Sequence, residues 1–133
     1  MAVSKEFNTY VQEQLRLLPA LTSRRMFGGI GLYSDSIFFA LLDDDTLFCK
    51  VDDSNRTDYV ERGARAFMPV GNKPLGYYSV PVEILEDTEE LTRWARKSVA
   101  VALATANRKL KPQAVSGRKA KTDRNRKRAQ PRR

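Results

Sequence analysis

Residues 37–42 are six consecutive apolar positions, and they constrain the fold of this chain more than any other stretch. A short polar break at residues 34–36 precedes them, and an acidic break at residues 43–45 follows them. Both breaks have the length of β-hairpin loops, and an unbroken apolar run is typical of a strand covered on both faces. We therefore expect an antiparallel meander with this run as its central strand.

The meander is predicted to contain three strands over residues 22–51. In its last strand, alternation places Leu47 and Cys49 on one face and Phe48 on the other. A chain of this size has enough helices to cover one face of such a sheet. We expect another copy of the protein, or a different protein partner, to cover the second face; the alternative is that long side chains of the neighbouring strands mask the central strand there.

The first predicted strand carries the most distinctive sequence, two arginines and a Met-Phe pair before two glycines. We interpret the Gly28-Gly29 pair as a bend or bulge, because an apolar run and not a helix follows it, unlike a phosphate-binding loop. Arg24 and Arg25 fall on opposite faces, where they either pair with carboxylates of Asp52 or residues 43–45, or recognise a ligand or partner. The candidate recognition residues are Arg24, Arg25, Met26, Phe27, Gly28 and Gly29.

Two helices are predicted before residue 63. Apolar residues recur at helical spacing over residues 4–18, and Ser4 is a natural N-cap for this helix. A second, short helix over residues 54–62 is predicted to end at Gly63, which suits the left-handed position after a helix.

The remaining elements complete an α+β fold. Residues 67–70 and 77–80 are predicted as strands, the first at a sheet edge because it contains Pro69. Asp87 resembles the N-cap of a capping box, and it precedes a helix over residues 88–106 that Trp94 anchors in the core. The predicted fold has two layers, an antiparallel five-stranded sheet and helices, in the order α-β(3)-α-β(2)-α.

The charge of the chain is divided between two regions. Residues 1–106 carry 12 Lys/Arg and 15 Asp/Glu, a net charge of −3, whereas residues 107–133 carry 12 Lys/Arg and one acidic residue, a net charge of +11. The second region has too few apolar residues to offset its ordering entropy. We therefore predict one domain over residues 1–106 and a disordered basic tail over residues 107–133.

A tail of this charge binds polyanions through counterion release, which predicts contact with nucleic acid. The alternative is a tail that serves solubility and has only incidental affinity. The tail contains no aromatic residue, so it offers no platform for base stacking. The candidate contact residues are Arg118, Lys119, Lys121, Arg124, Arg126, Lys127, Arg128, Arg132 and Arg133.

The composition argues against the usual catalytic and metal chemistry. The chain has no histidine, which removes the commonest general base and metal ligand, and we interpret its single cysteine, Cys49, as a small buried hydrophobe. The carboxylates at residues 43–45 and 52–53 lack EF-hand spacing and are interpreted as solvated turns. We predict no enzymatic activity, no cofactor and no metal.

A cytoplasmic location is expected. One cysteine fits a reducing compartment, and no signal peptide or membrane span is visible in the sequence. We accordingly expect no membrane partner.

The sequence from Arg25 to Tyr33, with the later Leu47-Phe48-Cys49-Lys50 and the helix around Trp94, resembles the TfoX N-terminal domain family. The resemblance covers roughly residues 5–105 and implies a two-layer α+β domain. TfoX-like (Sxy-like) proteins are bacterial regulators of competence genes, thought to act with a transcription activator and not known as enzymes. The resemblance supplies no catalytic residues.

Three hypotheses for function follow. The first is a non-enzymatic regulator of transcription whose domain binds a protein partner or itself through the second sheet face, while the tail contacts nucleic acid. The second is a general nucleic-acid-associated protein that acts through the tail alone. The third is a small-ligand-binding or enzymatic domain that uses the Gly28-Gly29 bend together with Arg25 and an Asp.

Overall fold

The computed structural model describes residues 3–26, 28–69, 71 and 74–110, with only the backbone described for the last three of these. The chain divides into two units, residues 1–103 and residues 104–133. All packing described below lies in the first unit. The disorder predicted from residue 107 onward is wrong for residues 107–110, which belong to the last helix, and residues 111–133 lie outside the described residues.

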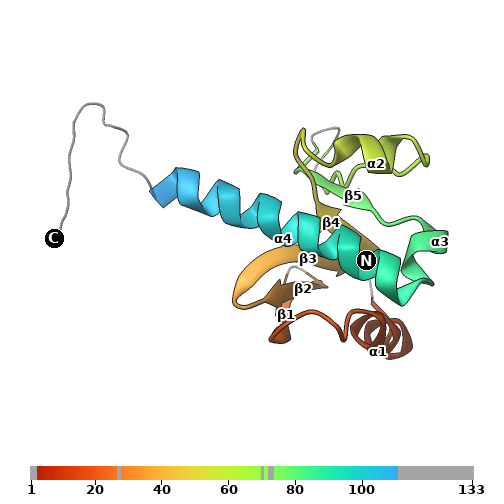
Figure 1. The fold of residues 1–133 in the computed structure, drawn as a ribbon. Helices are drawn as coiled ribbons and strands as arrows, with labels where there is room; N and C mark the ends of the chain where they lie inside the picture. Colours follow the sequence, from red (N-terminus) through yellow and green to blue (C-terminus); the bar gives the residue numbers. More distant parts are fainter. Residues whose placement is uncertain (1–2, 27, 70, 72–73, 111–133) are drawn as a thin grey trace, which may run out of the picture. The chain divides into compact units, whose positions relative to one another are not determined.

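The strands form one antiparallel sheet in chain order, as Figure 1 shows. They are β1 (Leu21–Met26), β2 (Gly29–Ser34), β3 (Ile37–Asp43), β4 (Thr46–Lys50) and β5 (Tyr77–Ser79). Two hairpin loops hold both of their central residues at positive φ, Asp35 and Ser36 after β2, and Asp44 and Asp45 after β3. Such turns match the twist of the flanking strands, and they confirm hairpins at both predicted breaks.

The segment predicted as one bent strand is in fact a hairpin. β1 and β2 pair with each other, with Arg25 opposite Ile30 and Met26 opposite Gly29. Gly28 has a φ of 80°, which reverses the chain at little cost only for glycine. The prediction of a bend was wrong because apolar periodicity alone does not separate a bent strand from a tight turn.

The predicted strand at residues 67–70 is not formed at residues 67–69, although they lie along β5, and residue 70 lies outside the described residues. Ala66 forms an isolated bridge with Tyr78, and the Phe67 N–H donates to the Tyr77 carbonyl at 2.8 Å. Pro69 has no N–H to continue such pairing. The sheet therefore has five strands as predicted, with four before the second helix instead of three.

Four helices accompany the sheet: α1 (Lys5–Gln14), α2 (Arg56–Val60), α3 (Val82–Leu85) and α4 (Thr88–Leu110). The Ser4 hydroxyl accepts from the Phe7 N–H at 3.1 Å, and the Asp87 carboxylate accepts from the Glu90 N–H at 3.1 Å, which confirms both predicted caps. Gly63 has a φ of 75° just after α2, as expected. α3 was not predicted, because four residues are too few to show a helical period.

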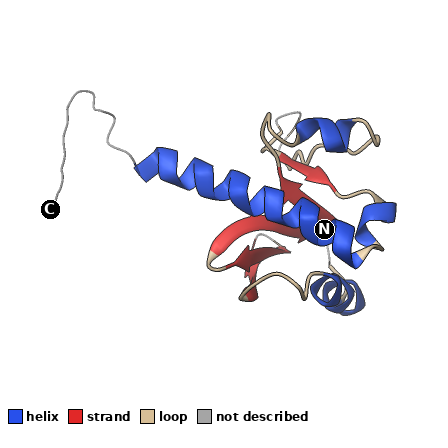
Figure 2. Cartoon of the chain, in the orientation of Figure 1, coloured by secondary structure: helices blue, strands red, loops and turns tan. Residues whose placement is uncertain are grey.

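The helices pack on one face of the sheet, and Figure 2 shows α4 passing in front of the strands. Trp94 of α4 meets Tyr59 of α2 edge to face, with 4.7 Å between the ring centroids, and it is buried as predicted. The Ser98 hydroxyl of α4 donates to the Lys50 carbonyl of β4 at 2.8 Å. On the strand side, Leu47 and Cys49 face this core, as alternation predicted.

The central strand is buried mainly on the helix side. A register shift at Leu32 and Tyr33 leaves Phe39 as an extra residue, so Phe39 and Ala40 are both fully buried. Phe38 and Leu41 are only half-buried. The expectation that both faces of this strand are covered is therefore not met within the described chain. None of the helices in the described ranges is long and apolar enough to cross a membrane.

Candidate functional site

The sheet face opposite the helices has the most distinctive chemistry of the domain, and we call it the open sheet face. Strand pairing and side-chain contacts place these residues on it: Arg24, Met26, Tyr33, Phe38, Leu41, Phe48, Lys50 and Tyr77. They come from all five strands, so the surface depends on the correct register of the whole sheet. No described helix covers it.

Three aromatic rings form a row across this face. The Tyr33 and Phe38 ring centroids lie 5.2 Å apart, and the Phe38 and Tyr77 centroids lie 5.8 Å apart. Tyr33 and Phe38 are half-buried, whereas Tyr77 is 8% exposed. Burial raises the pKa of Tyr77 to about 12, so its phenol is neutral at physiological pH. The rings available to a partner are therefore those of Tyr33 and Phe38.

Cations lie at both ends of the row. The Arg24 guanidinium carbon is 5.8 Å from the Tyr33 ring centroid, and Lys50 Nζ is 5.0 Å from the Tyr77 centroid. Both distances fit cation–π attraction. Both distances to the ring centroids are longer than the 3.5–4.0 Å of van der Waals contact between carbons, so neither cationic group is stacked directly on its ring.

Neither arginine of the motif is paired with a carboxylate of the described residues. Arg24 and Arg25 are both exposed, the first on the open sheet face and the second on the opposite face. The pairing that we expected with Asp52 or residues 43–45 is wrong, because β1 is an edge strand whose side chains extend into solvent. Recognition of a ligand or partner is the alternative that remains for Arg24.

Gly31 gives the face its shape, and sequence reasoning did not single it out. A Cβ added at Gly31 would lie 2.7 Å from Met26 Cε and 3.0 Å from Phe38 Cε1. The absence of a side chain therefore lets Met26 and Phe38 meet across β2. In the sequence Gly31 is visible only as a further glycine two residues after the Gly28-Gly29 pair. The strand pairing is needed to show why a glycine is required there.

A hollow of about 360 Å³ adjoins the row at its β1 end, lined by Thr22, Ser23, Arg24, Tyr33 and Ser36. Its lining combines hydroxyl groups, a guanidinium and an aromatic ring. Hydroxyl and guanidinium groups are donors for anionic oxygens. This end of the face is therefore suited to an anionic group beside a ring.

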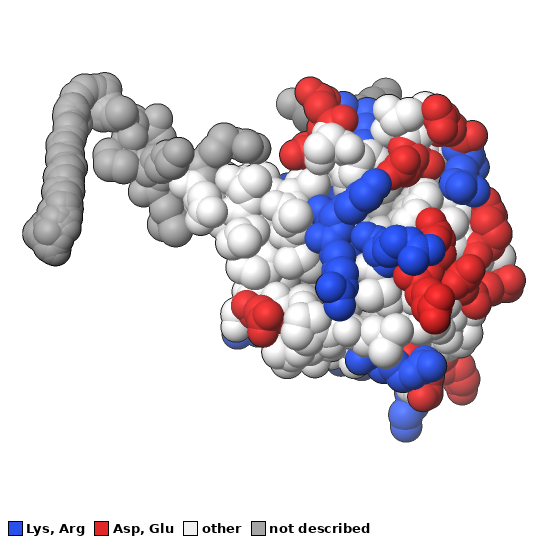
Figure 3. Space-filling view, viewed as in Figure 1, with Lys and Arg blue, Asp and Glu red and all other residues white. Residues whose placement is uncertain are grey.

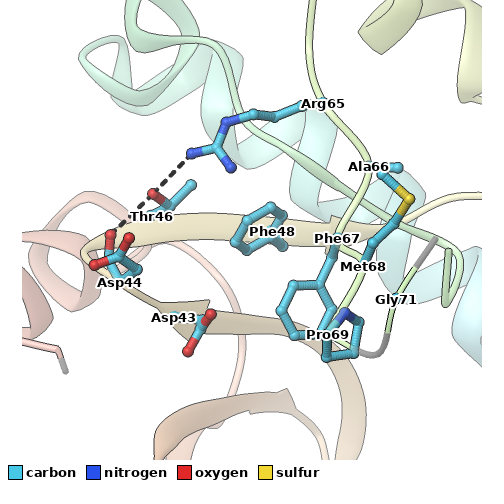
Figure 4. A pocket seen from close by; sticks show the side chains of 10 residues that line it. All are labelled: Asp43, Asp44, Thr46, Phe48, Arg65, Ala66, Phe67, Met68, Pro69 and Gly71. Atoms are coloured by element: carbon cyan, nitrogen blue, oxygen red, sulfur yellow. Dashed lines mark hydrogen bonds between the residues drawn. The ribbon is translucent and has the colours of Figure 1, made fainter. Parts of the chain in front are cut away.

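A second hollow, of about 350 Å³, lies at the other end of the sheet. Figure 4 shows Arg65 reaching toward Thr46, whose hydroxyl accepts from Arg65 Nη2 at 3.4 Å. The Arg65 guanidinium carbon is also 5.6 Å from the Phe48 centroid, and Phe67 covers Phe48 at 4.9 Å. Asp43 and Asp44 line this hollow together with Arg65, and Phe48 is 3% exposed, so the hollow suits an anionic group beside a ring less well than the first.

Several cations on the helix side are paired with carboxylates. Figure 3 shows basic side chains over α4 with acidic ones beside them. Arg93 is paired with Glu90, and Lys97 Nζ lies 3.1 Å from an Asp58 carboxylate oxygen. The hydrogen bond from Arg93 lowers the pKa of Glu90, so that carboxylate stays ionised and keeps its partner neutralised. The helix side is therefore a weaker surface for a polyanion.

The buried polar groups of the described residues offer no reactive centre. Cys49 is fully buried, and burial raises the pKa of its thiol to about 12, which keeps it protonated and unreactive at neutral pH. The hydroxyl of Tyr59 is buried near Cys49 and Ser98 but makes no well-formed hydrogen bond among the described residues.

Asp45, predicted to lie in a solvated turn, accepts from the Ser4 N–H at 2.7 Å.

The structure brings together some of the predicted site residues and not others. Arg24 and Met26 share the open sheet face, while Arg25 lies on the opposite face and Gly28 and Gly29 form the hairpin. Phe27 and the predicted nucleic-acid contacts at residues 118–133 lie outside the described residues. The row of Tyr33, Phe38 and Tyr77 was missed because it depends on the register of strands that are distant in sequence.

Comparison with known proteins agrees with this architecture. The family model of the TfoX N-terminal domain matches residues 13–102. No curated protein matches the chain. The matched region begins within α1, contains the whole sheet and ends within α4. The chain belongs to the TfoX N-terminal domain family.

Proposed function

We propose that this protein is a non-enzymatic regulatory protein of the cytoplasm that acts on transcription, including that of competence genes, through contacts with nucleic acid. Its basic tail holds the phosphate backbone, and its domain supplies a second contact surface, the open sheet face. Membership of the TfoX N-terminal domain family supports the regulatory part of this proposal.

The observation that carries the nucleic-acid part is the division of charge. A net charge of +11 lies in residues 107–133, against −3 in residues 1–106. Lysines and arginines concentrated in a short segment displace counterions from a phosphate backbone largely without regard to sequence. The domain, with its slightly negative net charge, adds little to this attraction as a whole.

The domain contributes through local chemistry. On the helix side Arg93 and Lys97 are paired with carboxylates, whereas Arg24 on the open sheet face has no carboxylate partner among the described residues. Rings and an unpaired guanidinium together favour a contact made by this face. Cys49 is the single cysteine of the sequence and has no partner for an internal disulfide, which agrees with a reducing compartment and supports the proposed location.

The test is the salt dependence of binding to a labelled DNA duplex, measured by fluorescence anisotropy with the full chain. If the tail engages about six phosphates, the slope of log K against log salt should be roughly −5. Replacing three tail cations at residues 126–128 (Arg126, Lys127 and Arg128) by Gln should reduce the magnitude of the slope by about 2 to 3.

A matched variant removes the same charge from the helix side, with Gln at Arg93, Arg96 and Lys97. All three side chains are exposed, so the fold should survive the change. This variant should keep the wild-type slope. Equal losses in the two variants would show that only net charge matters, and no binding by the full chain at about 50 mM salt would contradict the proposed function.

A further inference from the structure

We propose that the open sheet face binds single-stranded nucleic acid, with bases stacked on Tyr33 and Phe38 and a phosphate held beside Arg24. This inference rests on the proposed function, because the tail brings the nucleic acid to the domain. It adds a second site, a chemical preference for unpaired bases, and named residues that the tail does not supply.

The spacing of the rings favours a single strand. Stacked bases of a duplex rise by about 3.4 Å per step. The ring centroids of Tyr33 and Phe38 lie 5.2 Å apart in the surface of the sheet, so they match bases that are splayed from one another. Aromatic side chains on a sheet surface hold unpaired bases in this way, and every base offers a π-face, so little sequence preference is expected.

The hollow beside Tyr33 supplies the anion site that a nucleotide requires next to its base. Thr22 lies opposite Tyr33 in the β1–β2 ladder, and Arg24 lies two residues further along the same strand face. Both line the hollow of about 360 Å³, together with Ser36. A base on Tyr33 therefore has a guanidinium and two hydroxyl groups within the same hollow for its phosphate.

Charge favours nucleic acid over a second copy of the chain as the occupant. Two copies that meet through this face would each cover an exposed Arg24 guanidinium, for which the described residues of the domain supply no carboxylate partner. A polyanion is attracted by this guanidinium and by the net charge of +11 in residues 107–133, and the row of rings meets its bases.

The experiment compares a labelled oligo-dT with a duplex of the same length, by fluorescence anisotropy with the full chain across a salt series. Tyr33→Leu should weaken binding of the single strand by about 5- to 150-fold, the range expected for one lost base stack. It should leave the salt slope unchanged, because no phosphate contact is removed. Duplex binding should change less than twofold.

Two neighbouring arginines provide a matched pair. Arg24→Gln should reduce the magnitude of the single-strand salt slope by about 0.7, the value for one phosphate. Arg25→Gln removes the same charge one residue away on the opposite face and should keep the wild-type slope. Both side chains are exposed, so neither change should prevent folding even if Tyr33→Leu does. Tyr10→Leu, at a ring that is 40% exposed on α1, is the control for loss of a surface aromatic.

The outcomes separate the two proposals. Loss of single-strand affinity with Tyr33→Leu and Arg24→Gln, but not with Tyr10→Leu and Arg25→Gln, would support the inference. Wild-type affinity in all four variants, with binding lost only in the tail variant, would overturn it and leave the proposed function standing. A dimer by sedimentation that Tyr33→Leu dissociates would also overturn it, because a second copy would then occupy the face.

Discussion

Two buried hydroxyl groups near Cys49 should respond in opposite ways to their removal. The Tyr59 side chain is 1% exposed, and its hydroxyl has no well-formed hydrogen bond among the described residues. In the unfolded chain water bonds this hydroxyl, so folding bears its desolvation cost of about 1–3 kcal/mol. Tyr59→Phe keeps the ring against Trp94 and should raise the free energy of unfolding by about 1 kcal/mol.

Ser98→Ala is the matched variant. The Ser98 hydroxyl donates to the Lys50 carbonyl at 2.8 Å, and that oxygen also accepts from Asn55 Nδ2 at 3.2 Å. Because one donor remains, the variant should lower the free energy of unfolding by only about 0.5–1 kcal/mol.

Urea unfolding, with thermal melting as a second probe, measures both effects. A change of 1 kcal/mol corresponds to about 4–8 °C in melting temperature for a domain of this size. The m-value should stay constant in both variants, which would show that the compactness of the unfolded state has not changed. Destabilisation by Tyr59→Phe of about 1 kcal/mol or more would contradict this prediction, since it would mean that the hydroxyl is well bonded.

Three further predictions concern the fold and its titration. Gly29→Ala should lower the free energy of unfolding by about 1–3 kcal/mol, because its Cβ would overlap the Leu42 carbonyl oxygen, and urea unfolding would measure this. Asp87→Ala should lower it by about 0.5–2 kcal/mol through loss of the cap on the Glu90 N–H, whereas Asp87→Asn should recover most of it. The free energy of unfolding should fall as the pH rises from about 9 toward 12, because the Cys49 thiol ionises in the unfolded chain at a lower pH than in the folded chain. Cys49→Ala should flatten this part of the curve of unfolding free energy against pH. An unchanged curve would contradict the burial of the thiol.

Local sequence signals determined much of the fold. Ser4 and Asp87 were recognised as caps because their side chains satisfy helix N–H groups within three residues. The alternation of Leu47, Phe48 and Cys49 correctly divided β4 between the two faces. These features depend on neighbours in the chain, so one sequence is enough to predict them.

Features that depend on distant partners were harder to predict. Gly28 and Gly29 are the same residue type but are needed for different reasons. Gly28 adopts a positive φ, whereas Gly29 leaves room for the Leu42 carbonyl oxygen. Only the register of the sheet reveals this difference. Alternation correctly separated Arg24 from Arg25, yet it could not show that the first lies beside Tyr33. The contact of Phe38 with Tyr77 joins residues of β3 and β5, and no local pattern encodes it.

Chemical-shift mapping of the isotopically labelled full chain with oligo-dT would locate the binding surface residue by residue. We expect the largest changes in the domain at Arg24, Tyr33 and Phe38, on one face of the sheet. Residues of the helix side such as Arg93 should change little, although signals of the tail should also move. Changes confined to the tail, or centred on α4, would contradict the claim that the open sheet face binds single-stranded nucleic acid.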